Sequence, residues 1–224
     1  MSEIAPDGSP VLVYARLPPL GEAELIHEAV PAGSHILELG AGAGRVTHEL
    51  FALGHTVVAV DNSADMLAFI RGAETVLADM ETLHLERRFP VVLLASNFIN
   101  NPDSQSRRRF LECCARHVLS DGQVLLQGFP RDWVPNRDWS ERGDVRLRLR
   151  CYETDGAMIS GEMEYEIDGR QLVHAFASKL LTDEELDADL RAVALRRTRT
   201  LDGPGTWIEA VPEAARKRTQ PYAW

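Results

Sequence analysis

The amino-acid sequence predicts a doubly wound α/β fold, in which a mostly parallel sheet carries helices on both faces. Over the first two-thirds of the chain, short apolar segments alternate with segments of helical periodicity. The segment 90–95 is almost wholly apolar, as expected for a central parallel strand buried on both faces. After Phe129 the pattern changes to strict alternation of apolar and charged residues, which predicts an added antiparallel sheet.

Five short apolar segments are the predicted parallel strands. They span residues 35–39, 56–60, 75–78, 90–95 and 124–126. Apolar residues at helical spacing predict the intervening helices at 45–53, from the N-cap Ser63 onward, and at 104–118. Asp121 and Gly122 predict the turn that leads into the fifth strand.

The added sheet is predicted from three alternating segments within residues 144–179. Segments 145–150 and 162–167 alternate with period two, and Asp168-Gly169 predicts a hairpin into 171–178. The arginines of the first segment and the glutamates of the second would form cross-strand pairs on one face. The opposite, inward face would then carry apolar side chains, namely Leu147, Leu149, Met163, Tyr165 and Ile167.

The C-terminal part predicts one more helix and two more strands. Thr182 followed three residues later by Glu185 predicts a capping box at the start of a helix. Segments 195–201 and 206–211 flank Asp-Gly-Pro-Gly at 202–205, which predicts a strand, a turn and an antiparallel strand.

The composition is that of one globular domain spanning residues 1–224, with 45% hydrophobic and 26% charged residues. A formal net charge of −10 and only two short basic runs, at 107–109 and 216–218, argue against a nucleic-acid surface. No apolar run exceeds five residues, so we expect no membrane span. Three cysteines without ligand or disulfide spacing predict no metal site and favour the cytoplasm.

The segment with the clearest chemical meaning is Glu-Leu-Gly-Ala-Gly-Ala-Gly at 38–44. Glycines at a strand-to-helix turn let a ligand approach the backbone and expose the helix N-terminal amides. A nicotinamide dinucleotide fingerprint would place its third glycine five residues after Gly40, where this chain has Arg45. Glu38 would repel a pyrophosphate but suits a cofactor with an ammonium or sulfonium group.

This glycine motif resembles motif I of the class I S-adenosylmethionine-dependent methyltransferases. Further landmarks stand at the expected strand ends: Asp61, 21 residues after Gly40, then Asp79-Met80, and then Ser96. The resemblance covers about residues 30–212. It implies a seven-stranded, mostly parallel sheet with a terminal antiparallel pair and an added three-strand lid. The insertion is similar to that of the sugar amine N-methyltransferases of macrolide biosynthesis.

The resemblance also implies roles for individual residues. The cofactor S-adenosylmethionine would contact Tyr14, Arg16, Glu38, Gly40, Gly42, Asp61, Asn62, Met66, Asp79, Met80 and Ser96. The methyl acceptor would contact Phe98, Asn100, Phe129, Arg131 and Trp133. Tyr14 is the candidate catalytic residue, within an N-terminal lid segment at 1–30. The box Asn-Pro-Pro-Tyr of nucleic-acid amino methyltransferases is replaced by Ser-Asn-Phe-Ile at 96–99, which disfavours a nucleobase acceptor.

We therefore expect a cytoplasmic enzyme that transfers a methyl group to N or O of a small molecule, plausibly a secondary metabolite. No nucleic acid, membrane or metal partner is expected, and a homodimer is compatible with these features. Two alternatives stay open at this stage. One is a nicotinamide-dependent oxidoreductase, and the other is a non-catalytic module that binds the cofactor.

Overall fold

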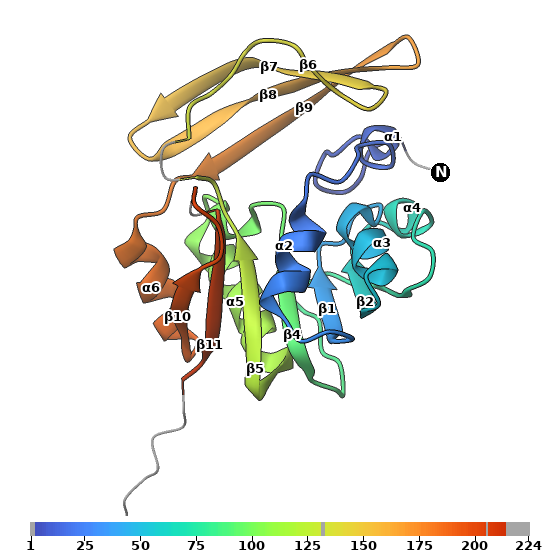
Figure 1. Ribbon diagram of the computed structural model, residues 1–224. Helices are drawn as coiled ribbons and strands as arrows, with labels where there is room; N and C mark the ends of the chain where they lie inside the picture. The colour runs from blue at the N-terminus through green and yellow to red at the C-terminus, as the bar shows by residue number, and fades with distance from the viewer. Residues whose placement is uncertain (1–2, 131–132, 205, 214–224) are drawn as a thin grey trace, which may run out of the picture.

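The computed structural model describes residues 3–130, 133–204 and 206–213. Seven strands form one sheet in the order β10-β11-β5-β4-β1-β2-β3 (Figure 1). All pairs are parallel except those of β11, which is antiparallel to both β5 and β10. The predicted seven-stranded sheet with its terminal antiparallel pair is confirmed. The strands are β1 His35–Leu39, β2 Thr56–Asp61, β3 Glu74–Leu77, β4 Phe89–Leu94, β5 Val118–Gln127, β10 Leu195–Thr200 and β11 Trp207–Pro212.

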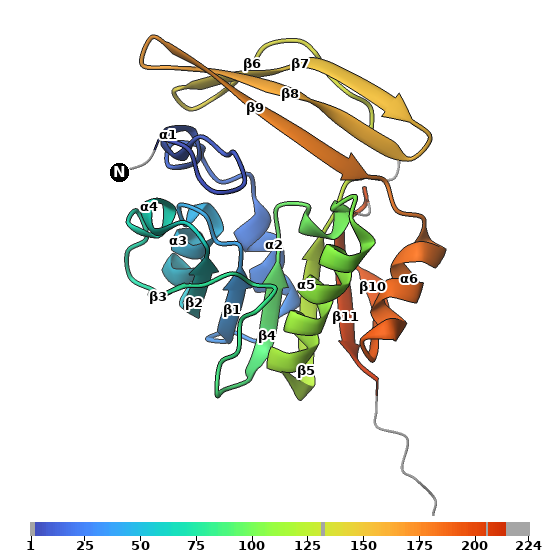
Figure 2. The same cartoon turned by 180° about the vertical axis from the view of Figure 1, so that it is seen from behind.

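Helices cover both faces of this sheet (Figures 1 and 2). One face packs against α2 Glu22–Ala29, α3 Arg45–Ala52 and α4 Ala64–Leu67, and the other against α5 Ser104–His117 and α6 Asp183–Ala192. Ser63 caps α4 as predicted, and the capping box of Thr182 and Glu185 starts α6. Among the described residues, no helix is long and apolar enough to cross a membrane.

The turn predicted at Asp121-Gly122 is instead a bulge within β5. Phe89 pairs with Val118, but Val91 already pairs with Gln123, so residues 119–122 form extra length in one strand. Gly122 sits where a Cβ atom would lie 2.7 Å from the carbonyl oxygen of Pro90. A glycine is therefore needed here because the bulge presses the two backbones together.

The added sheet has four strands and not the three predicted: β6 Ser140–Arg142, β7 Val145–Asp155, β8 Met158–Ile167 and β9 Arg170–Lys179. The short edge strand β6 has no alternating pattern that would reveal it. It follows Trp139, whose ring stacks under the guanidinium groups of Arg146 and Arg148 at 4.8 and 4.5 Å. That contact accounts for the extra strand at this edge.

The predicted two faces of the added sheet are confirmed. Its outer face carries three cross-strand ion pairs, Arg146–Glu166, Arg148–Glu164 (2.7 Å) and Arg150–Glu162 (3.4 Å). Its inner face carries the five apolar side chains expected there, four of them buried. These side chains lie over the N-terminal segment, defined here as residues 3–21.

The N-terminal segment is placed between the two sheets. Its helix α1, Val11–Tyr14, lies above α3 and α4 and below the added sheet in both views (Figures 1 and 2). Val13 packs with Leu147, Tyr165 and their neighbours above. Val11 packs below with Ala43 of the glycine turn and with a residue of α4. The segment therefore covers the edge of the main sheet where β1 and β2 end.

Candidate active site

The glycine turn between β1 and α3 is held by the neighbouring strand. The amides of Gly40 and Ala41 both donate to the carbonyl oxygen of Val60 at 2.9 Å. Gly42 has a φ of +56°, and a Cβ atom built on it would meet nothing within 4 Å. The turn is therefore fixed in shape and leaves open space directly above its central glycine, as a cofactor cradle requires.

Asp61 ends β2 beside that open space and is anchored by two backbone amides. Gly42 donates to its Oδ2 and Ser63 to its Oδ1, both at 2.8 Å. Burial raises the pKa of this half-buried carboxyl, while these hydrogen bonds act in the opposite direction. Each carboxylate oxygen keeps a further lone pair, so the group can accept two more hydrogen bonds from a pair of vicinal hydroxyls.

Glu38 lies beneath the turn, 3% exposed, and its Oε2 accepts the hydroxyl of Thr47 at 2.6 Å. Burial raises the pKa of Glu38 to about 7, against the effects of Thr47 and the nearby Arg45. The Arg45 guanidinium pairs with the buried carboxylate of Glu22 on α2. Arg45 therefore does not neutralise Glu38 directly, and the floor of the turn favours a cationic ligand group.

The ends of β3 and β4 bring Met80 and Phe98 against Gly40. A Cβ atom on Gly40 would lie 2.3 Å from the Phe98 ring and 3.1 Å from the Met80 methyl group. Asp79 is exposed, and its Oδ1 accepts the amide of Glu81. Met80, a predicted cofactor residue, and Phe98, a predicted acceptor residue, thus meet at one wall of the turn.

Ser96 follows β4 in an uncommon backbone conformation. Ser96 and Asn97 have φ values of +56° and +59°, and the Ser96 amide donates to Oε1 of Gln127 at 2.8 Å. Consecutive non-glycine residues in the left-handed region are costly and cluster at functional turns. This strained backbone lies in the turn after β4, whose Phe98 contacts the glycine turn.

Two other predicted cofactor residues lie at the side of this centre. Met66 is 3% exposed and packs with Ala5, Val11 and Ala43, so it joins α4 to the N-terminal segment. Asn62 is exposed at the tip of the turn after Asp61.

Tyr14 and Arg16 differ in where they lie. Tyr14 contacts both apolar clusters of the N-terminal segment, and burial raises the pKa of its hydroxyl. Arg16 is exposed and forms ion pairs with Asp144 and Asp168 of the added sheet. The structure therefore brings Tyr14 over the site, while Arg16 fastens the segment to the added sheet.

On the acceptor side, the carboxyl ends of β4 and β5 open into a cavity of about 420 Å³. It is lined by Asn100, Phe129, Pro130, Leu180, Leu181, Thr182, Asp183 and Glu184. The side chain of Asn100 donates to the carbonyl of Lys179 at 2.7 Å and accepts the Phe129 amide at 3.0 Å. The Phe129 and Trp133 rings stand 5.2 Å apart, and Arg131 lies outside the described residues.

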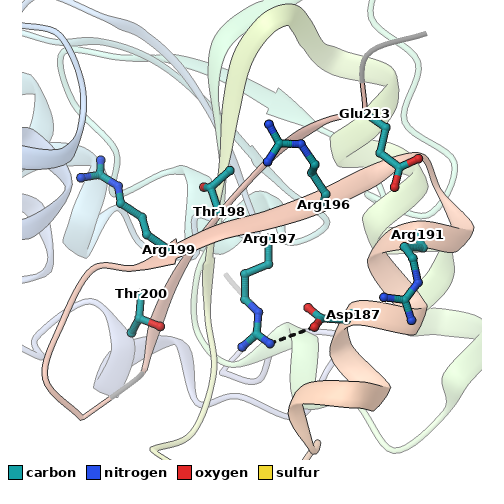
Figure 3. A pocket seen from close by; sticks show the side chains of 8 residues that line it. All are labelled: Asp187, Arg191, Arg196, Arg197, Thr198, Arg199, Thr200 and Glu213. Atoms are coloured by element: carbon teal, nitrogen blue, oxygen red, sulfur yellow. Dashed lines mark hydrogen bonds and ion pairs between the residues drawn. The ribbon is translucent and has the colours of Figure 1, made fainter. Parts of the chain in front are cut away.

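A second hollow, a groove of about 500 Å³ along β10 and α6, belongs to another part of the molecule (Figure 3). It contains four arginines, but Arg197 pairs with Asp183 and Asp187, and Arg199 pairs with Glu209. Strand β10 is four strands from β1, or ~19 Å at ~4.8 Å per strand. The groove is therefore separate from the glycine turn, and two of its four arginines are paired with carboxylates.

Four residues that shape the site were not predicted. Ser63 was expected only as a helix cap, yet its amide holds Asp61. The side chain of Gln127 accepts the Ser96 amide, and Tyr165 belongs to the apolar cluster against which Tyr14 packs. Glu22 pairs with Arg45 across 23 positions of sequence. No local pattern reveals the long-range contacts of Gln127, Tyr165 and Glu22, although a polar residue ending the predicted fifth strand was a usable signal for Gln127.

Comparisons with known proteins agree with this geometry. Residues 36–122 match the family described as "Methyltransferase domain". Over 120 residues the chain is 32% identical to a dTDP-3-amino-3,6-dideoxy-alpha-D-glucopyranose N,N-dimethyltransferase of Streptomyces fradiae, covering 50% of this chain and 47% of that protein. A shorter match of 52 residues, 40% identical, covers 23% of this chain and 18% of a probable ribosomal RNA small subunit methyltransferase A of Haloquadratum walsbyi. The chain thus spans less than half the length of either curated relative.

Solved structures share the whole fold. The CcbJ methyltransferase of Streptomyces caelestis has a TM-score of 0.73 at 18% identity, covering 96% of this chain and all of that one. The amino pentose methyltransferase CalS10 of Micromonospora echinaspora has a TM-score of 0.66 at 18% identity, covering 85% of this chain and 88% of that one. At these identities the likeness establishes the fold, including the added sheet.

Proposed function

We propose that this chain, which has the class I methyltransferase fold and a methyltransferase domain over residues 36–122, transfers a methyl group from S-adenosylmethionine to an amine nitrogen of a small molecule. The observation that carries the proposal is the anchored carboxylate of Asp61 beside the open space over Gly42. The site therefore combines a carboxylate, held in place and able to accept two hydroxyl groups, with a stretch of backbone that a ligand can approach.

The residues at the turn fit the chemistry of this cofactor. Asp61 would hold the ribose hydroxyls, and Met80 would offer an apolar surface to the adenine ring. Glu38 would accept a hydrogen bond from the methionyl ammonium, directly or through water. When bound, S-adenosylmethionine supplies an electrophilic methyl group and a neutral thioether leaving group. The protein's own share of the work is to hold, orient and dehydrate the two reactants.

The charges at the turn disfavour a nicotinamide dinucleotide. Burial and, to a smaller extent, the charge of Asp61 raise the pKa of Glu38, so a pyrophosphate here would face two neighbouring carboxylates. Arg45, the nearby cation, is already paired with Glu22. The cavity at the ends of β4 and β5 supports a catalytic protein over a module that only binds the cofactor.

An amine acceptor suits the site better than an alkyl alcohol. A neutral amine attacks without a strong base, whereas an alcohol needs a base within hydrogen-bond reach. The acceptor-side cavity combines the Phe129 ring with the polar groups of Thr182 and Glu184, and its volume is typical of small-molecule pockets. The aminosugar named for the Streptomyces fradiae relative makes that nucleotide sugar the first acceptor to test, and secondary metabolism the proposed setting.

The whole chain would act as one functional unit. The N-terminal segment and the added sheet would act as lids over the crevice, and Phe98, Asn100, Phe129, Arg131 and Trp133 would form its acceptor side. A cytoplasmic location is supported by the three free cysteines, of which Cys151 is exposed.

Calorimetry tests the cofactor part of the proposal. S-adenosylhomocysteine should bind with one site per chain, and NADH should give no heat of binding under the same conditions. Binding of NADH in place of S-adenosylhomocysteine would overturn the proposal.

A further inference from the structure

One buried side chain links the two walls of the acceptor-side cavity. The first wall is Phe129 and Pro130, which follow β5, and the second is residues 180–184, which connect β9 to the first turn of α6. Asn100, 4% exposed, lies between β4 and α5. Its amide oxygen accepts the Phe129 backbone amide at 3.0 Å, and its amide nitrogen donates to the carbonyl of Lys179, next to the second wall, at 2.7 Å. The Asn100 carboxamide therefore joins one wall to the other.

The two backbone partners fix the orientation of this amide. Phe129 offers an N–H group and Lys179 offers a carbonyl oxygen, so a flipped amide would place like groups together at both ends. An aspartate at position 100 could accept from Phe129 but could not donate to Lys179. A carboxamide, with one donor and one acceptor on the same planar group, matches both walls at once.

The carboxamide is closely packed against the end of β5. A Cβ atom on Gly128 would lie 3.0 Å from the Asn100 amide oxygen and 3.3 Å from the side chain of Ile99. Ile99 is itself 3% exposed and belongs to the core of the main sheet. The glycine therefore lets the amide reach the Phe129 N–H group, and the core fixes the turn that carries Asn100.

Other contacts hold the second wall to α6 and to the added sheet. The Leu180 amide donates at 2.8 Å to the carbonyl of Ala157, which lies between β7 and β8. The side-chain nitrogen of Lys179 pairs with Glu185 of α6 at 2.6 Å. These contacts leave the position of the second wall relative to the first to be set across the cavity, where Asn100 makes its two hydrogen bonds.

We propose that Asn100 is a positioning residue for the methyl acceptor, because its carboxamide sets the separation of the two cavity walls and thereby the fit of the acceptor between them. The inference rests on the proposed function and deepens it. Asn100 acts on the acceptor through the Phe129 ring and the wall at 180–184. The glycine turn takes part in neither hydrogen bond, so loosening the walls should weaken acceptor binding and leave cofactor binding intact.

The first test reads the link without turnover, by NMR-detected hydrogen exchange. In Asn100→Ala the Phe129 amide loses its acceptor and should exchange at least about tenfold faster, whereas Asn100→Asp keeps an acceptor and should preserve its protection. The neighbouring Gly128 amide, which donates to the carbonyl of Thr206 at 2.8 Å, is the internal reference and should be unchanged. Equal exchange of the Phe129 amide in the wild-type and Asn100→Ala proteins would overturn the link itself.

The second test is steady-state kinetics with dTDP-3-amino-3,6-dideoxy-D-glucose as the acceptor probe. Asn100→Asp turns a carboxylate oxygen toward the Lys179 carbonyl, so the acceptor KM should rise about tenfold with a much smaller change in kcat. The Kd of S-adenosylhomocysteine, measured by calorimetry, should stay the same. Asn101→Asp is the matched control, because it adds the same charge one residue away and keeps the oxygen that accepts the Asp103 amide at 2.9 Å.

A second variant disturbs the same carboxamide from the other side and adds no charge. In Gly128→Ala the new Cβ atom would press on the Asn100 amide oxygen, so the acceptor KM should rise here too. Gly203→Ala, between β10 and β11, is its control, because a Cβ atom there would meet nothing within 4 Å. Both control variants should keep the wild-type KM.

The kinetic pattern separates positioning from a general loss of folding. A structural defect would lower kcat and the number of S-adenosylhomocysteine sites together, at an unchanged acceptor KM. That pattern, or an unchanged KM in both Asn100→Asp and Gly128→Ala, would overturn the role of Asn100 and leave the proposed function standing. Absence of methyl transfer to any amine by the wild-type protein would overturn the proposed function, and the acceptor role of Asn100 with it.

Discussion

Replacing Asp61 by alanine should weaken S-adenosylhomocysteine binding by roughly tenfold to a hundredfold. The carboxylate would accept both ribose hydroxyls. One hydrogen bond to a charged group contributes about 1.5–3 kcal/mol, and we expect a loss of this size for the pair because water replaces the missing acceptor. At ~1.4 kcal/mol per factor of ten, the lower bound is about tenfold and the upper bound about a hundredfold. Both ribose contacts depend on one residue, so no neighbouring group would compensate.

The same change has a second effect that the assay must separate. The amides of Gly42 and Ser63 would lose their acceptor, and each unpaired buried amide costs ~1–3 kcal/mol of stability. Binding is therefore measured by calorimetry at a temperature where circular dichroism shows a folded protein. Asp121→Ala, in the exposed bulge of β5, is the matched control and should bind normally. A folded Asp61→Ala protein with an unchanged Kd would refute the placement of the ribose at this carboxylate.

Three further predictions follow from the glycine turn, from Glu38 and from the N-terminal segment. Gly42→Val should abolish calorimetric binding of S-adenosylhomocysteine, because the added side chain would fill the space where the cofactor meets the turn. Gly54→Val is the control: it introduces similar backbone strain, at a positive φ with open space around it, but should keep binding. Normal binding by Gly42→Val would refute the role of the glycine turn in holding the cofactor. Since burial raises the pKa of Glu38 to about 7, the contribution of this group to the free energy of unfolding should fall between about pH 4.5 and 7, by ~3 kcal/mol at most, and stay level above pH 7. Glu38→Gln should abolish that slope in urea titrations. If the methionyl ammonium pairs with ionised Glu38, S-adenosylhomocysteine should bind more tightly at pH 8 than at pH 6, and a pH-independent Kd would contradict the pairing. Amides of residues 11–20 should gain hydrogen-exchange protection on adding S-adenosylhomocysteine. Deleting residues 1–18 should lower turnover more than it lowers thermal stability. Equal exchange with and without the ligand would show that the N-terminal segment does not act as a lid.

The main sheet was predictable because its signals are local. Most parallel strands contain a short apolar run, and two of them lead into a residue that shapes the site: Gly40 follows β1, and Asp61 ends β2. Three strands of the added sheet followed from alternation and from the Asp168-Gly169 hairpin, and the charged face pairs as expected because Arg148 and Glu164 lie directly opposite. These features depend on the spacing of apolar residues and on the order of the strands along the chain, and both can be recognised from short stretches of sequence.

The remaining features depend on contacts between distant segments. Strand β6 is too short for a period to show, and it is accounted for by the stacking of Arg148 on Trp139. Arg16 was expected at the cofactor, but its ion pairs with Asp144 and Asp168 join positions more than 120 residues apart. The packing of Tyr14 likewise depends on residues of β7 and β8 in the added sheet. Such pairings arise only once the two sheets and the N-terminal segment have come together.

The most direct test of the whole account is methyl transfer from trideuteromethyl-labelled S-adenosylmethionine to dTDP-3-amino-3,6-dideoxy-D-glucose, with the product analysed by mass spectrometry and NMR. The account predicts a product that carries the labelled methyl group on nitrogen, formed at a rate that collapses in Gly42→Val. A broader set of small amines, offered under the same conditions, extends the test beyond this one sugar. Label recovered on no acceptor nitrogen, or recovered equally with Gly42→Val, would contradict the central claim.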